Sequence, residues 1–181
     1  MWGFGNRASP SQAVHDELTA TALVLDDGAT RVGVVSADVI ALEDWHVAAL
    51  RERAAAEVGV PPENMLISLT HTHSGPLTWL GRGYDEMVRA YLDNLTNQLV
   101  GAHGWASREA RPARLGFGRG EVQKQVNRRE KRPDGTTVLG VNQDGPVDRE
   151  VGVLRVDGEE GRSVAALVNY ACHPVILGPL S

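Results

Sequence analysis

The sequence has one cysteine, no long hydrophobic run and no excess of basic residues. A single cysteine, Cys172, excludes an intramolecular disulfide and a cysteine-rich zinc site, so a zinc site here needs histidine and oxygen ligands. No apolar stretch approaches the ~18 residues of a membrane span, and the N-terminus lacks the charged and apolar regions of a signal peptide. The sequence leaves the compartment and the oligomeric state undetermined.

Charge excludes a second group of functions. The chain has 18 lysines and arginines against 23 aspartates and glutamates, a formal net charge of −5. General affinity for nucleic acid or for an anionic membrane needs a basic surface, so neither partner is expected. The basic cluster from Lys124 to Arg132 is local and is interpreted as a solvated loop.

The first half of the chain alternates strand and helix patterns. Strand-like runs at 19–25 and 31–38 are joined by an Asp-Gly turn, which favours an antiparallel hairpin. Apolar residues recur at helical spacing over 42–58 and are followed by a strand-like run at 64–70, which predicts a βαβ unit with a right-handed crossover. A second helical pattern runs from Met87 to His103.

Beyond Pro112 the pattern is β, with expected strands at 113–122, 151–156 and 163–172 and a hairpin around 133–135. With 181 residues, 42% of them hydrophobic, the chain has the length of one domain with a core. We therefore predict a single domain over residues 1–181, of α/β class, with a mixed β-sheet flanked by helices.

Two histidines directly follow the third strand-like run. In an extended segment alternate side chains share a face, so His71 and His73 would point the same way, roughly 6–7 Å apart along the strand. The Ser-Gly-Pro that follows ends the strand at the edge where open α/β sheets place their clefts. Neutral imidazole is a common zinc ligand, so the pair indicates a metal site, although a His-x-His pair also occurs by chance.

Another strand-like run, at 164–172, is followed directly by His173 and Pro174. Two strands that each end in histidine and a proline-containing turn are what a metal cleft at one sheet edge requires. Cys172, the neighbour of His173, faces the other way in an extended strand and is expected to pack in the core rather than to act as a nucleophile.

Thr-His-Thr-His-Ser-Gly-Pro at 70–76, within 64–76, resembles the signature of the neutral/alkaline non-lysosomal ceramidase family in its N-terminal catalytic region. Further segments are similar to that family in the same order. They are 14–16, 34–38, 126–128 and 169–174.

The resemblance implies a zinc-dependent amidase that cleaves an N-acyl lipid such as ceramide to a fatty acid and a sphingoid base. It implies that His71 and His173 bind one zinc ion, that His73 contacts the reacting amide and that Arg128 stabilises the carbonyl oxygen. The resemblance also places His15, Ser74 and Gly75 near the substrate, His15 being the weaker candidate.

Several residues have competing interpretations. Arg128 lies in a run of basic residues that alone would indicate a solvated surface. Asp38 ends a strand and either accepts a hydrogen bond from a ligand imidazole or caps a helix. His46 and His103 lie on helical patterns and are interpreted as structural.

The chain departs from the family pattern in length. The family supplies further zinc ligands, a glutamate and a tyrosine, and a serine-containing active-site segment, all expected beyond Ser181. We therefore interpret the sequence as a part of the catalytic domain truncated at both ends, which alone binds zinc weakly and hydrolyses no substrate measurably. The alternatives are a catalytically incomplete or vestigial module and a zinc hydrolase with another ester or amide substrate. An amidohydrolase barrel is disfavoured because the second half is composed of hairpins.

Overall fold

The computed structural model describes residues 1–5, 7, 9–175 and 178. The chain forms two compact units, Met1–Ala110 with Pro174–Ser181, and Arg111–His173. Each unit is described by itself below, and the single domain expected over the whole chain stays a prediction.

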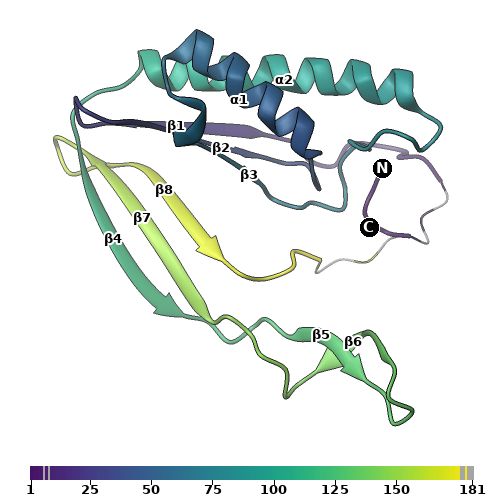
Figure 1. Cartoon of the computed structure of the whole chain (residues 1–181). Helices are drawn as coiled ribbons and strands as arrows, with labels where there is room; N and C mark the ends of the chain where they lie inside the picture. Colours follow the sequence, from purple (N-terminus) through teal and green to yellow (C-terminus); the bar gives the residue numbers. More distant parts are fainter. Residues whose placement is uncertain (6, 8, 176–177, 179–181) are drawn as a thin grey trace. The chain divides into compact units, whose positions relative to one another are not determined.

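The first unit contains a three-stranded sheet of order β1-β2-β3 and two long helices (Figure 1). The antiparallel pairing of β1 with β2 and the parallel pairing of β2 with β3 confirm the predicted hairpin and βαβ unit. The sheet is therefore mixed. Its elements are β1 (Ala20–Asp26), β2 (Arg31–Ala37), α1 (Asp44–Val58), the short 3-10 helix η1 (Pro62–Asn64), β3 (Met65–Leu69) and α2 (Asp85–Arg108).

Both helices lie over the same face of this sheet (Figure 1). On that face Val35, Ala37 and Met65 are buried, whereas Leu66 on the opposite face is 50% exposed. The sequence predicted helices on the faces of the sheet without distinguishing one face from two. Here α2 contacts β1, β2 and α1, which builds the core between the helices and one side of the sheet.

The buried stripe of α1 recurs every four residues and includes His46, which is 6% exposed, and on α2 His103 is 2% exposed. Both histidines therefore face the core, as their structural interpretation predicts. α1 ends at Gly59, whose positive φ of 69° favours glycine and whose N–H donates to the carbonyl of Ala55.

The second unit is entirely β. A three-stranded antiparallel sheet has the order β4-β7-β8, and β5 pairs with β6 in a separate hairpin (Figure 1). The strands are β4 (Ala113–Glu121), β5 (Asn127–Lys131), β6 (Thr137–Asn142), β7 (Glu150–Gly158) and β8 (Ser163–Tyr170). The hairpin around 133–135 and the hairpin of the last two strands are confirmed.

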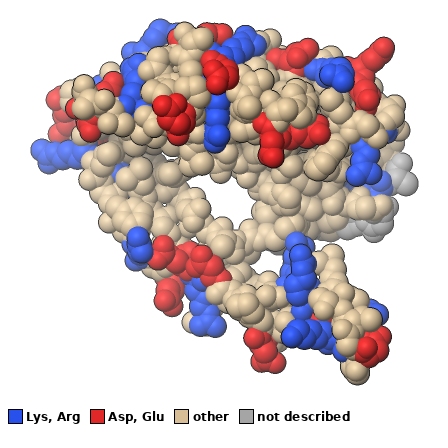
Figure 2. Space-filling view, in the orientation of Figure 1, with Lys and Arg blue, Asp and Glu red and all other residues tan. Residues whose placement is uncertain are grey.

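The predicted α/β class is confirmed, although the strands are divided among three sheets. The burial expected for Cys172 is wrong, because β8 ends at Tyr170 and the cysteine beyond the strand is exposed. Among the described residues no helix is long and apolar enough to span a membrane. On the face of the first unit seen in Figure 2, acidic and basic side chains are interspersed.

Candidate metal centre

The candidate site begins where the parallel strands β2 and β3 end. Beyond the strands the two chains stay hydrogen-bonded, with the N–H of Thr70 donating to the carbonyl of Ala37 at 3.0 Å and the N–H of His71 donating to Val39 at 3.1 Å. The loop then turns back, and the buried hydroxyl of Thr78 donates to the carbonyl of Ala41. The segment after β2 therefore fixes the backbone of the loop that carries the histidine pair.

His71 does not have the extended conformation that was predicted for it from strand alternation. Its φ is 60°, in the left-handed region, and it is the only non-glycine residue with positive φ in the described chain. Its Nδ1 lies 2.7 Å from the carbonyl oxygen of Ile40. A carbonyl can only accept, so Nδ1 carries the proton and the neutral ring presents its lone pair on Nε2. Such a partner is typical of metal-binding histidines because it fixes the tautomer.

His73 lies beside His71 in the same loop. The two ring centroids are 5.0 Å apart with an interplanar angle of 73°. The rings come together through the turn at His71 and not through strand alternation, so the predicted proximity is present for a different reason. The backbone of His73 is held by Arg7, whose Nη1 donates to the His73 carbonyl at 2.7 Å.

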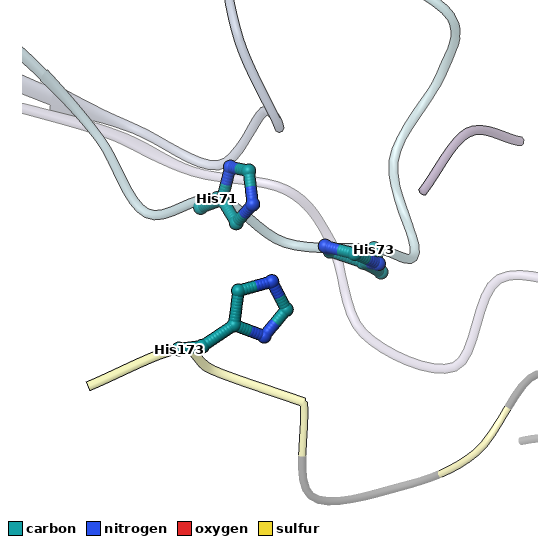
Figure 3. A group of neighbouring side chains, drawn as sticks. All are labelled: His71, His73 and His173. Carbon is teal, nitrogen blue, oxygen red and sulfur yellow. The ribbon is translucent and has the colours of Figure 1, made fainter. Parts of the chain in front are cut away.

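His173 is the last residue of the second unit and is bonded to Pro174, where the chain rejoins the first unit. One ligand atom from each of His71, His73 and His173 lies within 4.8 Å of the other two (Figure 3). In a tetrahedral site with zinc–nitrogen bonds of 2.0–2.1 Å the nitrogens are about 3.3 Å apart, so this spacing is compatible with one shared metal ion. Three imidazoles, one with its tautomer already set, fit zinc.

The carboxylate of Asp38 is hydrogen-bonded to Thr19. Its Oδ2 accepts hydrogen bonds from the N–H and the hydroxyl of Thr19, at 2.8 and 2.7 Å. Partial burial alone would raise the pKa of Asp38, but these bonds and one from Thr70 lower the pKa below its ordinary value. α1 begins at Asp44, so Asp38 does not cap it, and the acceptor for His71 is the backbone carbonyl of Ile40.

The expected substrate contacts are dispersed. Ser74 is exposed, and its N–H donates to the hydroxyl of Thr72 at 3.2 Å. Gly75 is buried, with its carbonyl accepting the N–H of Trp2 at 3.1 Å. The side chain of His15 is 96% exposed, paired with Asp16 at 2.7 Å, and is outside the three-histidine group.

Arg128 is half-buried in the second unit, where it lines a hollow of about 380 Å³ together with Ala171, two residues before His173. One wall of this hollow is fixed by Gln125, which accepts from the Tyr170 hydroxyl and donates to the carbonyl of Asp148 at 2.7 Å. The solvated surface expected from the charge run therefore does not describe Arg128 fully.

Sequence reasoning missed four residues that shape these places: Gly3, Arg7, Ile40 and Gln125. Ile40 acts through its own carbonyl, Arg7 bonds to the backbone carbonyl of His73, and Gly3 lies against His73 because it has no side chain. No motif marks such contacts. Gln125 gave a weak signal only, because it precedes the Val-Asn-Arg segment at 126–128 by one residue.

The fold and the histidine group together define an α/β protein with a candidate metal centre. No family model matches the chain. It is 26% identical over 192 residues to neutral ceramidase B of Dictyostelium discoideum. The aligned region covers 96% of this chain and 26% of that protein.

Solved structures agree with that comparison. The neutral ceramidase of Pseudomonas aeruginosa superimposes with a TM-score of 0.73 at 22% identity over 93% of this chain and 28% of that one. A ceramidase complexed with C2 gives a TM-score of 0.69 at 21% identity over 91% of this chain and 27% of that chain. The chain thus spans about a quarter of the length of the relatives it matches. The predicted resemblance to neutral ceramidases is confirmed, and the chain is similar to a part of these hydrolases.

Proposed function

We propose that this chain is the histidine-bearing part of a zinc-dependent amidase that cleaves an N-acyl lipid of ceramide type to a fatty acid and a sphingoid base. The observation that carries the proposal is the three-histidine group, found in a chain similar to neutral ceramidases. In this proposal His71 and His173 hold the zinc ion. The relatives are about four times longer than this chain, so further ligands are expected from outside it.

Zinc, when bound, lowers the pKa of a coordinated water and polarises the amide carbonyl. The residues of this chain have the remaining tasks. His71 presents Nε2 because Ile40 holds the proton on Nδ1. His73 contacts the amide, accepts a proton from the attacking water and passes this proton to the departing amine as the C–N bond breaks. Imidazole side chains suit both steps because their ordinary pKa lies near neutrality. Arg128 supplies a permanent positive charge for the oxygen on which negative charge develops.

The proposed substrate contacts on the histidine loop are Ser74 and Gly75. Ser74, on the exposed side of the loop, has a hydroxyl available for polar substrate groups, whereas buried Gly75 shapes the loop that bears it. His15 contributes only if substrate reaches its exposed position. A lipid amide remains the proposed substrate because the similar proteins are ceramidases.

Zinc titration of the 181-residue chain by calorimetry tests the metal assignment. We expect weak binding that is abolished in His71→Ala and in His173→Ala and is unchanged in the control His15→Ala, whose histidine is outside the group. Binding that is indifferent to all three substitutions would overturn the assignment.

His73→Ala separates proton transfer from ligation. If His73 acts on the amide, the variant keeps its zinc affinity within about threefold, and the gene product that carries this chain loses turnover of an N-acylsphingosine. Loss of zinc affinity in His73→Ala would make it a third ligand instead, as in three-histidine zinc sites. Absence of turnover on a panel of N-acyl lipids by the zinc-loaded gene product would refute the proposed reaction and favour a vestigial module.

A further inference from the structure

The N-terminal segment is packed onto the histidine loop through its described residues. The Trp2 N–H donates to the carbonyl of Gly75 at 3.1 Å, and the Trp2 ring meets Trp79 edge to face, with centroids 5.6 Å apart. Arg7 donates to the carbonyl of His73 at 2.7 Å. These contacts join a segment without periodic sequence to the loop that bears two of the three clustered histidines.

Gly3 lies directly against the imidazole of His73. A Cβ at position 3 would be 2.5 Å from Cγ of His73, 2.6 Å from Nδ1 and 2.7 Å from Cβ. The backbone of Gly3 also has a φ of 122°, which favours glycine. Any other residue at this position would both strain its backbone and displace the ring.

The ring of His73 is held from two further directions. Phe4 meets it edge to face with centroids 5.0 Å apart and an angle of 67°, and His71 meets it at 5.0 Å and 73°. Edge-to-face aromatic contacts have preferred geometry, so they restrict the rotation of a ring that is half-buried between them. The carbonyl of the same residue is bound by Arg7, so its backbone and side chain are both held.

From this packing we propose that Gly3 is a positioning residue for His73, and that the N-terminal segment fixes the direction in which the imidazole faces the three-histidine group. The inference rests on the proposed function of that group. Gly3 itself touches neither substrate nor metal in this proposal. It acts by allowing the His73 ring to lie on the backbone, where Phe4 then covers it.

The test compares Gly3→Ala with Gly5→Ala. Gly5 is the matched control because it is two residues away, exposed, and a Cβ there would meet nothing within 4 Å. In the metal-free 181-residue chain, the ring signals of His73 are followed by two-dimensional NMR on histidine-labelled protein and assigned by their loss in His73→Ala. We expect Gly3→Ala to shift the His73 signals and Gly5→Ala to leave them unchanged.

The second readout is turnover in the gene product that carries this chain. A displacement of the reacting group by about 1 Å can cost ~100-fold in rate, so Gly3→Ala should lower kcat by about that factor with KM little changed. Melting midpoints of both variants show whether the loss is only structural. If Gly3→Ala does not fold, Phe4→Leu replaces it, since leucine keeps the apolar cover but loses the edge-to-face contact.

Unchanged His73 signals in Gly3→Ala, or in Phe4→Leu where that variant is used, would overturn the inference. Equal effects of Gly3→Ala and Gly5→Ala would also overturn it. The metal-free NMR readout is independent of zinc and substrate. A chain that shows the expected shift but binds no zinc would therefore retain the packing role of Gly3 and refute the proposed function alone.

Discussion

The substitution Gly33→Ala tests how tightly the core is packed under the strand that leads to the site. Gly33 lies in the middle strand β2, opposite Val24 on one side and Met65 on the other. A Cβ at this position would be 2.8 Å from Nε2 of His103 and 3.3 Å from its Cδ2. His103 is 2% exposed and belongs to α2, so its ring has little space in which to move.

The magnitude follows from this clash. Ordinary contact begins near 3.4 Å, so the ring or the helix must shift by about 0.6 Å or more in an interior packed as densely as a crystal. Overpacking of this kind costs about 1–3 kcal/mol of unfolding free energy. For a chain of this size each kcal/mol lowers Tm by about 2–4 °C, so we expect a decrease of roughly 2–12 °C.

Gly101→Ala is the matched control on α2 itself. A Cβ there meets nothing within 4 Å, and alanine is a better helix former than glycine. The unfolding free energy of this variant should therefore rise by up to about 1 kcal/mol. All four tryptophans lie in the first unit, so fluorescence-detected urea unfolding reports on the unit that carries both substitutions. A Gly33→Ala variant as stable as Gly101→Ala would refute the reasoning.

Three further outcomes are expected. Burial lowers the pKa of His46 and of His103 below the ordinary value of 6.5, so the unfolded chain binds more protons in acid than the folded chain does. The contribution of the two histidines to the unfolding free energy is therefore fully present above about pH 6.5 and should be lost as the pH falls through the folded pKa values. Urea unfolding across pH 5–8 will measure this trend. Asp38→Ala removes the acceptor of two hydrogen bonds from Thr19 and one from Thr70, and should lower the unfolding free energy by about 1–2 kcal/mol, against no loss for Asp16→Ala in the same assay. Gln125→Ala removes the hydrogen bonds to Tyr170 and Asp148 in the hollow that Arg128 lines, so turnover by the gene product should fall while zinc affinity stays constant. Turnover equal to that of the unsubstituted protein would show that these bonds do not position the arginine.

Local signals in the sequence predicted much of the fold. The Asp-Gly turn at 27–28, the helical period of 42–58 and the following strand correctly indicated the hairpin and the βαβ unit. The division into two units was not predicted, because the change to a β pattern beyond Pro112 does not show whether the two parts share one core. The placement of both helices on one face depends on long-range packing of α2 against β1, which no local pattern contains.

The sequence predicted the residues of the candidate site but not the backbone turn and contacts that position them. His71, His73 and His173 were selected from motifs, and the structure groups them. The sequence could not indicate the left-handed turn at His71, its carbonyl partner Ile40, or the contact of Gly3 with His73. These features depend on backbone positions set by segments that are distant in the chain.

The left-handed backbone at His71 has a consequence for the balance between stability and chemistry. A residue with a β-carbon is disfavoured there by roughly 1–2 kcal/mol, a penalty that glycine escapes and asparagine reduces. Glycine or asparagine at position 71 would therefore relieve backbone strain, but either residue would remove the imidazole that we propose as a zinc ligand. A screen of this chain for thermal tolerance is therefore expected to recover His71→Gly and His71→Asn, which lack the proposed zinc ligand.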